Sequence, residues 1–173
     1  MLTYLSKILQ IRGMKLLIEI ILIIAVFLVI KSYSQRDLVQ DNLPYFEATL
    51  LGGEKFASSH LNNKPLLLHF WASWCPVCEM ENDSIESLSK NYQVISVAMQ
   101  SGTDMEVEQY LKENQLSFPT IIDEHGAIAK KFGIVGVPVS FIISPDGKIA
   151  FSEIGYTTEL GLRIRLWLAA KEN

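Results

Sequence analysis

The sequence predicts an α/β fold in which helices flank a mixed β-sheet, and three observations carry this prediction. An apolar strand, residues 66–71, runs directly into the pair Cys75 and Cys78, and residues with helical spacing follow that pair. Strand and helix patterns then alternate as far as residue 132, as they do in a parallel sheet. Finally, two strand-like stretches joined by a Pro-Asp-Gly turn form an antiparallel pair ahead of a last helix.

The chain has a long apolar run near its N-terminus, residues 14–33. Twenty residues in a helix span about 30 Å, the thickness of a bilayer's hydrocarbon core. Lys15 and Lys31 lie at the two ends of the run. Between them Glu19 is the one acidic residue; it lies near the N-terminal end, and we interpret it as an edge acid at the interface. We therefore expect a transmembrane anchor here, after a cytoplasmic segment 1–13 and before a linker 34–41 and a domain 42–173.

Basic residues indicate the orientation of this anchor. Three lie before the run or at its start (Lys7, Arg12 and Lys15), and two lie at its end or after it (Lys31 and Arg36). The excess on the N-terminal side favours a cytoplasmic N-terminus and a domain across the membrane. A cleaved signal peptide is the alternative, since the small residues Ser32 and Ser34 form a tolerable cleavage site; the length of the run favours a retained anchor.

The charge of the domain excludes some partners. Five of the 15 basic residues and one of the 19 acidic residues lie within residues 1–36, which leaves 10 against 18 and a formal net charge of −8. This charge argues against nucleic acid and against attraction to an anionic membrane surface. No cysteine lies outside the pair, so a disulfide-linked dimer would consume it, and we expect a monomer.

Before the central strand we expect a β-hairpin. Residues 44–51 and 54–56 have the β-branched and aromatic content of strands, and Gly52-Gly53 turns one back into the other. The strand 66–71 is apolar on both faces, as expected where helices cover both sides of a parallel sheet.

After the cysteines, one continuous helix is expected to bury a single stripe of side chains: Val77, Glu81, Ile85, Leu88 and Tyr92. Strands at 94–98 and 119–123 follow, with a helix between them that a capping box from Thr103 to Glu106 opens. A short helix over 127–132 ends at Gly133.

The C-terminal part is expected to form strands 139–143 and 148–152 around the turn, and then a helix over 158–170. The apolar residues of this helix that we expect to face the core are Leu160, Ile164, Trp167 and Leu168.

The cysteine pair carries the chemistry. A thiolate at Cys75, in the first turn of a helix, is favoured by the orphan N–H groups and the helix dipole. Pro76 fits an early turn, and Cys78 is close enough to attack a mixed disulfide formed at Cys75. A structural disulfide would close only a tiny loop, and two Cys with three scattered His do not form a tetrahedral metal site. Redox exchange is the favoured interpretation.

These motifs resemble the thioredoxin superfamily. The resemblance rests on Trp74-Cys75-Pro76-Val77-Cys78, on Glu81 and on residues 133–138, and it is closest to the membrane-anchored TlpA, ResA and DsbE branch, ScsD in particular. It implies the thioredoxin strand order, an N-terminal hairpin extension, and a cis Pro138 opposite the disulfide. It also implies that the Val137 backbone pairs with an extended substrate and that Trp74 and Pro76 line the groove.

Two ionisable residues are candidates for proton transfer. Glu81 lies on the inward stripe, three residues past Cys78, and the resemblance implies that it exchanges a proton with that cysteine; a carboxylate reaching water is the alternative. His69 stands where thioredoxin has a buried acid. It is either a proton carrier or, more commonly for a lone strand histidine, a satisfied core residue. Trp71 is expected in the core.

The resemblance implies a protein thiol–disulfide oxidoreductase of the bacterial inner membrane, with its domain in the periplasm and no cofactor besides the Cys75–Cys78 disulfide. Protein thiols would be its substrates and a membrane thiol reductase its electron donor. Reduction is favoured over oxidation because the anchored relatives mostly reduce. One alternative is a cytochrome c maturation factor, which a groove for Cys-x-x-Cys-His peptides would distinguish. The other is a copper-tolerance module, which tight Cu(I) binding without exchange would distinguish.

Overall fold

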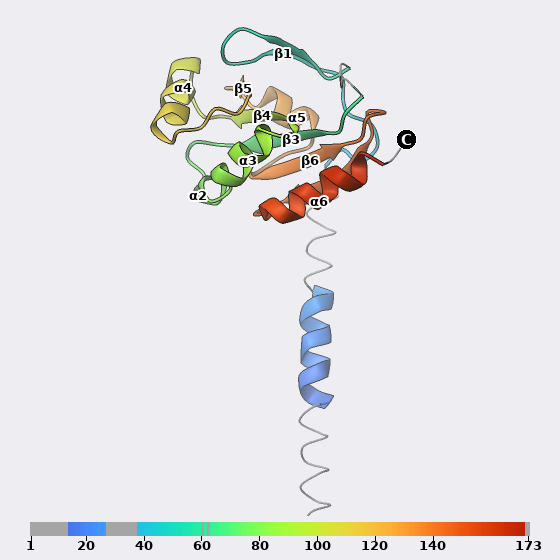
Figure 1. Cartoon of the computed structure of the whole chain (residues 1–173). Coiled ribbons are helices and arrows are strands. Elements are labelled where there is room, and N and C mark those ends of the chain that lie inside the picture. The colour runs from blue at the N-terminus through green and yellow to red at the C-terminus, as the bar shows by residue number, and fades with distance from the viewer. Residues whose placement is uncertain (1–13, 27–37, 60, 62, 172–173) are drawn as a thin grey trace, which may run out of the picture. The chain divides into compact units, whose positions relative to one another are not determined.

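The computed structural model describes residues 14–26, 38–59, 61 and 63–171, and the chain divides into two compact units, 1–36 and 37–173 (Figure 1). In the first unit, residues 14–26 are helical. Within the described ranges no helix is both long and apolar enough to cross a membrane. The remainder of the expected anchor, 27–33, lies outside the described residues, as does the expected cytoplasmic segment, so both stay predictions.

The second unit is built on a five-stranded mixed sheet in the order β5-β4-β3-β6-β7. Its strands are β3 (Leu66–Trp71), β4 (Gln93–Met99), β5 (Thr120–Asp123), β6 (Val139–Ile143) and β7 (Ile149–Ile154). β3 and β5 run parallel to β4, while β6 is antiparallel to both β3 and β7. All six residues of β3 are buried, as their apolar character predicts. The predicted mixed sheet is confirmed.

Five helices accompany the sheet in this described unit: α2 (Pro76–Glu79), α3 (Asn82–Ser89), α4 (Asp104–Glu113), α5 (Ala127–Lys131) and α6 (Glu159–Ala169). Residues of α2, α3, α4 and α6 share one hydrophobic cluster with one face of the sheet, and α5 belongs to the cluster on the other face. The capping box of α4 is present as predicted, from Thr103 to Glu106. This layered arrangement is the predicted α/β architecture.

The N-terminal hairpin is also confirmed. β1 (Glu47–Thr49) pairs antiparallel with β2 (Lys55–Ala57), and Gly52 and Gly53 adopt the positive φ angles that the tight turn requires. Phe56 and Phe46 pack against each other, and Phe46 also meets Phe132 edge-on. The hairpin therefore covers the sheet face that carries α5.

The described part of the expected linker is packed on the domain. Leu38 is buried in the core, and the Val39 N–H donates to the Phe132 carbonyl at 3.2 Å. The Ile149 N–H donates to the Asp41 carbonyl at 2.9 Å. The packing of the domain therefore includes residues before Asn42, because Leu38, an apolar side chain in a mostly polar stretch, is buried in the core.

The prediction for the face of α6 was wrong. Leu162, Leu166 and Ala169 are buried, whereas the four residues expected inside are exposed. The helix has apolar residues on two opposite sides, so periodicity alone does not decide between them. One ion pair is consistent with the observed orientation, because Arg165 on the flank of the helix pairs with Glu153 of β7.

Candidate redox site

The two cysteines form a disulfide where β3 runs into α2, with their Cα atoms 5.3 Å apart. Cys75 is the N-cap of α2, and the Cys78 N–H points at the Cys75 Sγ from 3.2 Å. Cys78 is fully buried, while Cys75 keeps a small exposed surface. Cys75 is therefore the sulfur that a partner can reach, and the Cys78 N–H would stabilise a thiolate on it.

Pro76 occupies the start of α2. A proline fits there because its missing N–H would have no intrahelical partner and its fixed φ suits a first helical residue. Its position at the helix start, directly after the accessible cysteine, is as predicted.

A cis peptide bond between Val137 and Pro138 faces the accessible cysteine. The Cys75 Sγ lies 3.6 Å from the Val137 carbonyl oxygen, which brings together residues 62 positions apart in the chain. The Gly155 N–H donates to the Pro138 carbonyl at 2.9 Å and ties this loop to the end of β7. The predicted cis geometry is confirmed; the pairing of Val137 with substrate stays a prediction.

Glu81 is buried, with 1% of its surface exposed. Its Oε1 accepts a hydrogen bond of 2.5 Å from the Thr157 backbone N–H, while its Oε2 is buried and has no hydrogen-bond partner among the described residues. Burial raises the pKa of Glu81 to about 7, and the bond from Thr157 only partly opposes this. A carboxyl group of this kind exchanges its proton near neutral pH, as general acid–base chemistry requires.

A break in the active-site helix gives Glu81 its position. Instead of one continuous helix there are two, because the Glu81 N–H donates to the Cys78 carbonyl three residues back. Glu81 is then the N-cap of α3, and its carbonyl accepts from Ile85. The expected stripe is broken accordingly: Val77 is 39% exposed, while Glu81, Ile85 and Leu88 are buried. The tighter turn shifts the register between the two halves.

His69 lies in the middle of β3 and is buried. Its Nδ1 is 2.9 Å from the Ser140 hydroxyl on the neighbouring strand β6, opposite it in register. Burial lowers the pKa of His69 to about 3, so the ring is neutral at physiological pH. This geometry is typical of a core histidine whose ring has a hydrogen-bond partner. The predicted role of His69 in proton transfer stays a prediction.

The two tryptophans near the site differ in burial, as predicted. Trp71 is in the core, with its indole N–H donated to the Ser96 hydroxyl at 3.1 Å. Trp74 is exposed beside Cys75, and its indole N–H donates to the Gln100 carbonyl at 3.0 Å. Trp74 is therefore held at the rim by its polar edge and offers its apolar faces to solvent.

Sequence reasoning missed the loop after β7. Thr157 meets Glu81 through its backbone N–H, a group that every residue except proline has, so no sequence signal marks it. The adjacent Tyr156 is exposed, as are Met80 and Val135 near the disulfide. These exposed apolar side chains make the surroundings of the site suited to a protein surface.

A groove of about 780 Å³ lies elsewhere on the domain, at the opposite end of β3 from the cysteines. It is bordered by Lys64, Gln93 and Trp167 among others, and none of the residues of the candidate site lines it. The site is therefore separate from this groove.

A family model for the AhpC/TSA family matches residues 39–152. The chain is 35% identical to a "Thioredoxin-like protein" of Haemophilus influenzae, over 91% of this chain and 93% of the relative. It is 36% identical to the "Thiol-disulfide oxidoreductase ResA" of Bacillus thuringiensis over 61% of this chain, and it spans 64% of that relative's length.

Solved structures share this fold. StoA from Bacillus subtilis superposes with a TM-score of 0.61 at 26% identity, over 72% of this chain and 96% of StoA. A secreted Mycobacterium tuberculosis disulfide oxidoreductase homologous to E. coli DsbE superposes with a TM-score of 0.62 at 22% identity, over 71% of this chain and 95% of that one. At 22% identity, the second superposition is evidence for the shared fold alone.

Proposed function

This chain belongs to the AhpC/TSA family as a thioredoxin-like thiol–disulfide oxidoreductase, and we propose that it reduces protein disulfides outside the bacterial cytoplasmic membrane, held there by its N-terminal anchor. The observation that carries the proposal is the arrangement of three groups around one disulfide. Cys75 is accessible at a helix start, the cis Val137–Pro138 bond faces it, and Glu81 is buried one turn beyond Cys78.

In the first step, the reduced protein attacks its substrate through the Cys75 thiolate. A bond forms between the Cys75 Sγ and one substrate sulfur, the substrate disulfide breaks, and the other substrate sulfur leaves as a thiolate that takes up a proton. The Cys78 N–H, 3.2 Å from the Cys75 Sγ, lowers the energy of the attacking anion. The Val137 carbonyl lies 3.6 Å from the same sulfur and, in the reduced protein, could accept a hydrogen bond from the Cys75 thiol before it ionises.

In the second step, Cys78 resolves the mixed disulfide. The Glu81 carboxylate takes the Cys78 proton, and the Cys78 sulfur attacks the Cys75 Sγ. The bond between the Cys75 Sγ and the substrate sulfur breaks, and that sulfur leaves as a thiolate that takes up a proton. The substrate gains two electrons and two protons, and the Cys75–Cys78 disulfide is formed. Glu81 suits this role because its pKa of about 7 allows both protonation states at neutral pH. Its N–H bond of 3.0 Å to the Cys78 carbonyl fixes the two residues one turn apart.

The cycle closes when a membrane thiol reductase returns two electrons to the disulfide. A cytoplasmic reductant does not reach a domain on the far side of the membrane, so this donor must lie in the membrane itself. No cofactor beyond the Cys75–Cys78 pair is needed, because both half-reactions are thiol–disulfide exchanges.

The test uses the full chain with a disulfide-bonded model peptide and an excess of dithiothreitol as the final reductant. Cys75→Ser is expected to lose all turnover above the rate with dithiothreitol alone. Cys78→Ser, reduced beforehand and freed of dithiothreitol, is expected to accumulate a mixed disulfide visible by mass spectrometry. Full turnover by Cys75→Ser would overturn the proposed function. Tight Cu(I) binding without turnover by the parent chain would assign the site to copper handling instead.

A further inference from the structure

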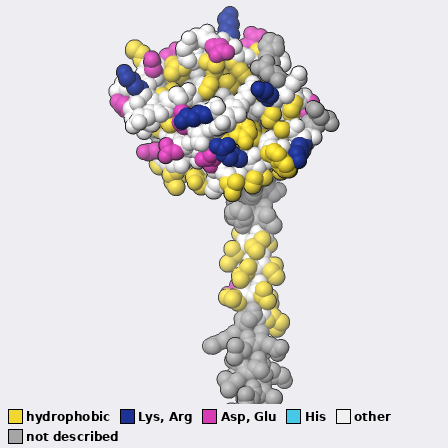
Figure 2. All heavy atoms as spheres, in the orientation of Figure 1, with side chains coloured by type: hydrophobic (Ala, Val, Ile, Leu, Met, Phe, Trp, Pro, Cys, Tyr) yellow, Lys and Arg dark blue, Asp and Glu magenta, His cyan; other side chains and the backbone are white. Residues whose placement is uncertain are grey.

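Helix α6 has a second apolar face, which is exposed in the described part of the domain. Its four members, which we name the α6 apolar face, are Leu160 (67% exposed), Ile164 (49%), Trp167 (56%) and Leu168 (40%). They recur at helical spacing on the side opposite to the residues that the helix buries. Figure 2 shows hydrophobic side chains gathered over the part of the surface that α6 occupies in Figure 1.

Single exposed apolar residues are ordinary on a protein surface, but four large ones on one helix face are typical of a binding surface. The helix itself is well anchored without them. Leu162 and Leu166 are fully buried, Thr158 caps the N-terminus through its side chain, and Arg163 reaches Glu159 and Ser87. The fully buried residues of α6 therefore lie on the opposite side from the α6 apolar face.

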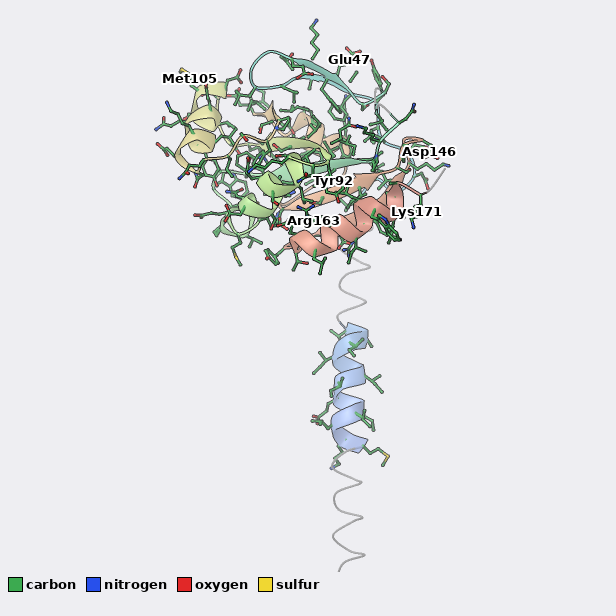
Figure 3. All side chains as sticks on the ribbon, in the orientation of Figure 1. Glu47, Tyr92, Met105, Asp146, Arg163 and Lys171 are labelled. Carbon is green, nitrogen blue, oxygen red and sulfur yellow. A yellow bond between two sulfur atoms is a disulfide. The ribbon has the colours of Figure 1, made fainter. Side chains whose placement is uncertain are left out.

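Basic side chains border this face. Arg163 lies on one flank and Arg165 on the other, paired with Glu159 and Glu153 respectively, and the Lys171 ammonium lies 3.4 Å from the Trp167 ring centroid. Figure 3 labels Arg163 on α6 and Lys171 just beyond the C-terminal end of this helix. An apolar stripe containing Trp and edged by long basic side chains is the pattern of helices that lie in a membrane interface.

The chain limits how far Leu38 can lie from the end of the predicted anchor. Four residues, 34–37, separate the end of the predicted anchor from Leu38, which is buried in the domain. Five Cα–Cα steps reach at most about 18 Å, whereas a domain of this length has a diameter of roughly 37 Å. After Leu38 the chain follows β7, where Asp41 accepts from Ile149, and α6 is tied to the same strand through Arg165.

We propose that the α6 apolar face lies on the lipid bilayer, in the interfacial region where Trp is favoured. The inference rests on the proposed membrane anchor. The domain's formal net charge of −8 does not favour attraction to anionic lipid, so the contact is apolar and is insensitive to salt. Since α6 starts directly after Thr157, which binds Glu81, a helix lying flat would hold the cysteine pair close to the membrane, within reach of a membrane-embedded electron donor.

The test uses the full chain reconstituted in phosphatidylcholine vesicles, with and without bromine on the acyl chains. Bromine quenches the fluorescence of a tryptophan that reaches the acyl region. The quenching that belongs to Trp167 is the difference between the parent chain and Trp167→Phe, because the Trp71 and Trp74 signals are common to both. We expect brominated lipid to remove most of the Trp167 emission, at low and at high salt alike.

The paired variants are Ile164→Glu on the α6 apolar face (49% exposed) and Met105→Glu on α4, an apolar residue on another helix that is more exposed (78%). Ile164→Glu is expected to abolish the Trp167 quenching and Met105→Glu to leave it unchanged, with both variants melting at the parent temperature.

Vesicle flotation separates this inference from the anchor. If the chain floats with the vesicles but Trp167 is not quenched, the bilayer contact is wrong while the anchor stands. A concentration-dependent dimer in that case would assign the face to a second copy. If the chain does not float at all, the anchor fails and the bilayer contact fails with it.

Discussion

The Thr157 backbone N–H donates a 2.5 Å hydrogen bond to the Glu81 carboxylate across 76 positions of sequence. This contact joins the loop after β7 to the break between α2 and α3. It satisfies one carboxylate oxygen of Glu81 and leaves the other buried without a partner among the described residues. An acid held in this way pays a solvation penalty when it ionises, and that penalty has measurable consequences for activity and for stability.

Glu81→Gln should change the pH dependence of exchange. The parent rate is expected to rise with an apparent pKa near 7, because ionised Glu81 takes the proton of Cys78. In Glu81→Gln we expect the rate at pH 7.5 to fall by about tenfold to a hundredfold, and the inflection near pH 7 to disappear. The control is Glu79→Gln, an exposed acid on α2, which should keep the parent profile. An inflection retained in Glu81→Gln would assign it to another group.

The same carboxyl should make the protein less stable as the pH rises. The folded pKa of about 7 lies above the ordinary value of 4.5, so the folded protein holds a proton that the unfolded chain has lost between these two values. Stability due to this group is therefore complete below pH 4.5 and is lost as the pH rises through 7. Urea unfolding of the parent and of Glu81→Gln should show the variant gaining on the order of 2–3 kcal/mol relative to the parent between pH 4 and pH 8. A constant difference across this range would contradict the assignment.

His69 should make the folded protein less stable as the pH falls, whereas Glu81 should make it less stable as the pH rises. Its folded pKa of about 3 lies below the ordinary 6.5, so the unfolded chain takes up a proton first as the pH falls. The parent therefore loses stability between pH 6.5 and pH 3. Relative to the parent, His69→Asn should gain on the order of 2 kcal/mol between pH 7 and pH 4.5, whereas the exposed control His125→Asn should not. Equal slopes in both variants would show that His69 is not the group responsible.

The orientation of α6 can be tested by paired truncations. Leu162→Ala removes a fully buried side chain and should cost about 2–5 kcal/mol of unfolding free energy. Leu160→Ala removes an exposed side chain two residues earlier in the same helix and should change it by no more than about 0.5 kcal/mol. Chemical denaturation of the two variants, measured side by side, decides the matter; the reverse ranking would restore the orientation that the sequence suggested.

Much of the fold was predictable because it depends on local sequence patterns. The five apolar residues of β3 predicted a strand covered on both faces, and Gly52-Gly53 marked the hairpin turn. The site was predictable for a different reason: Cys75 and Cys78 are the only cysteines, and Glu81 is an acid on an otherwise apolar stripe.

The errors arose where tertiary contacts decide between local alternatives. Helix α6 is apolar on two sides, and only its contacts with the sheet select Leu162 over Leu160. At the break before Glu81, the Glu81 N–H donates to the carbonyl three residues back instead of four. No residue type between Val77 and Glu81 indicates this change. Thr157 acts through its backbone, which composition cannot show.

The central claim is tested most directly by the reduction potential of the Cys75–Cys78 pair, measured by equilibrating the full chain in detergent with dithiothreitol and glutathione buffers. The account predicts a value below roughly −230 mV, as in proteins that reduce disulfides. A value near −120 to −180 mV, the range of oxidants and isomerases, would contradict the proposed reducing direction.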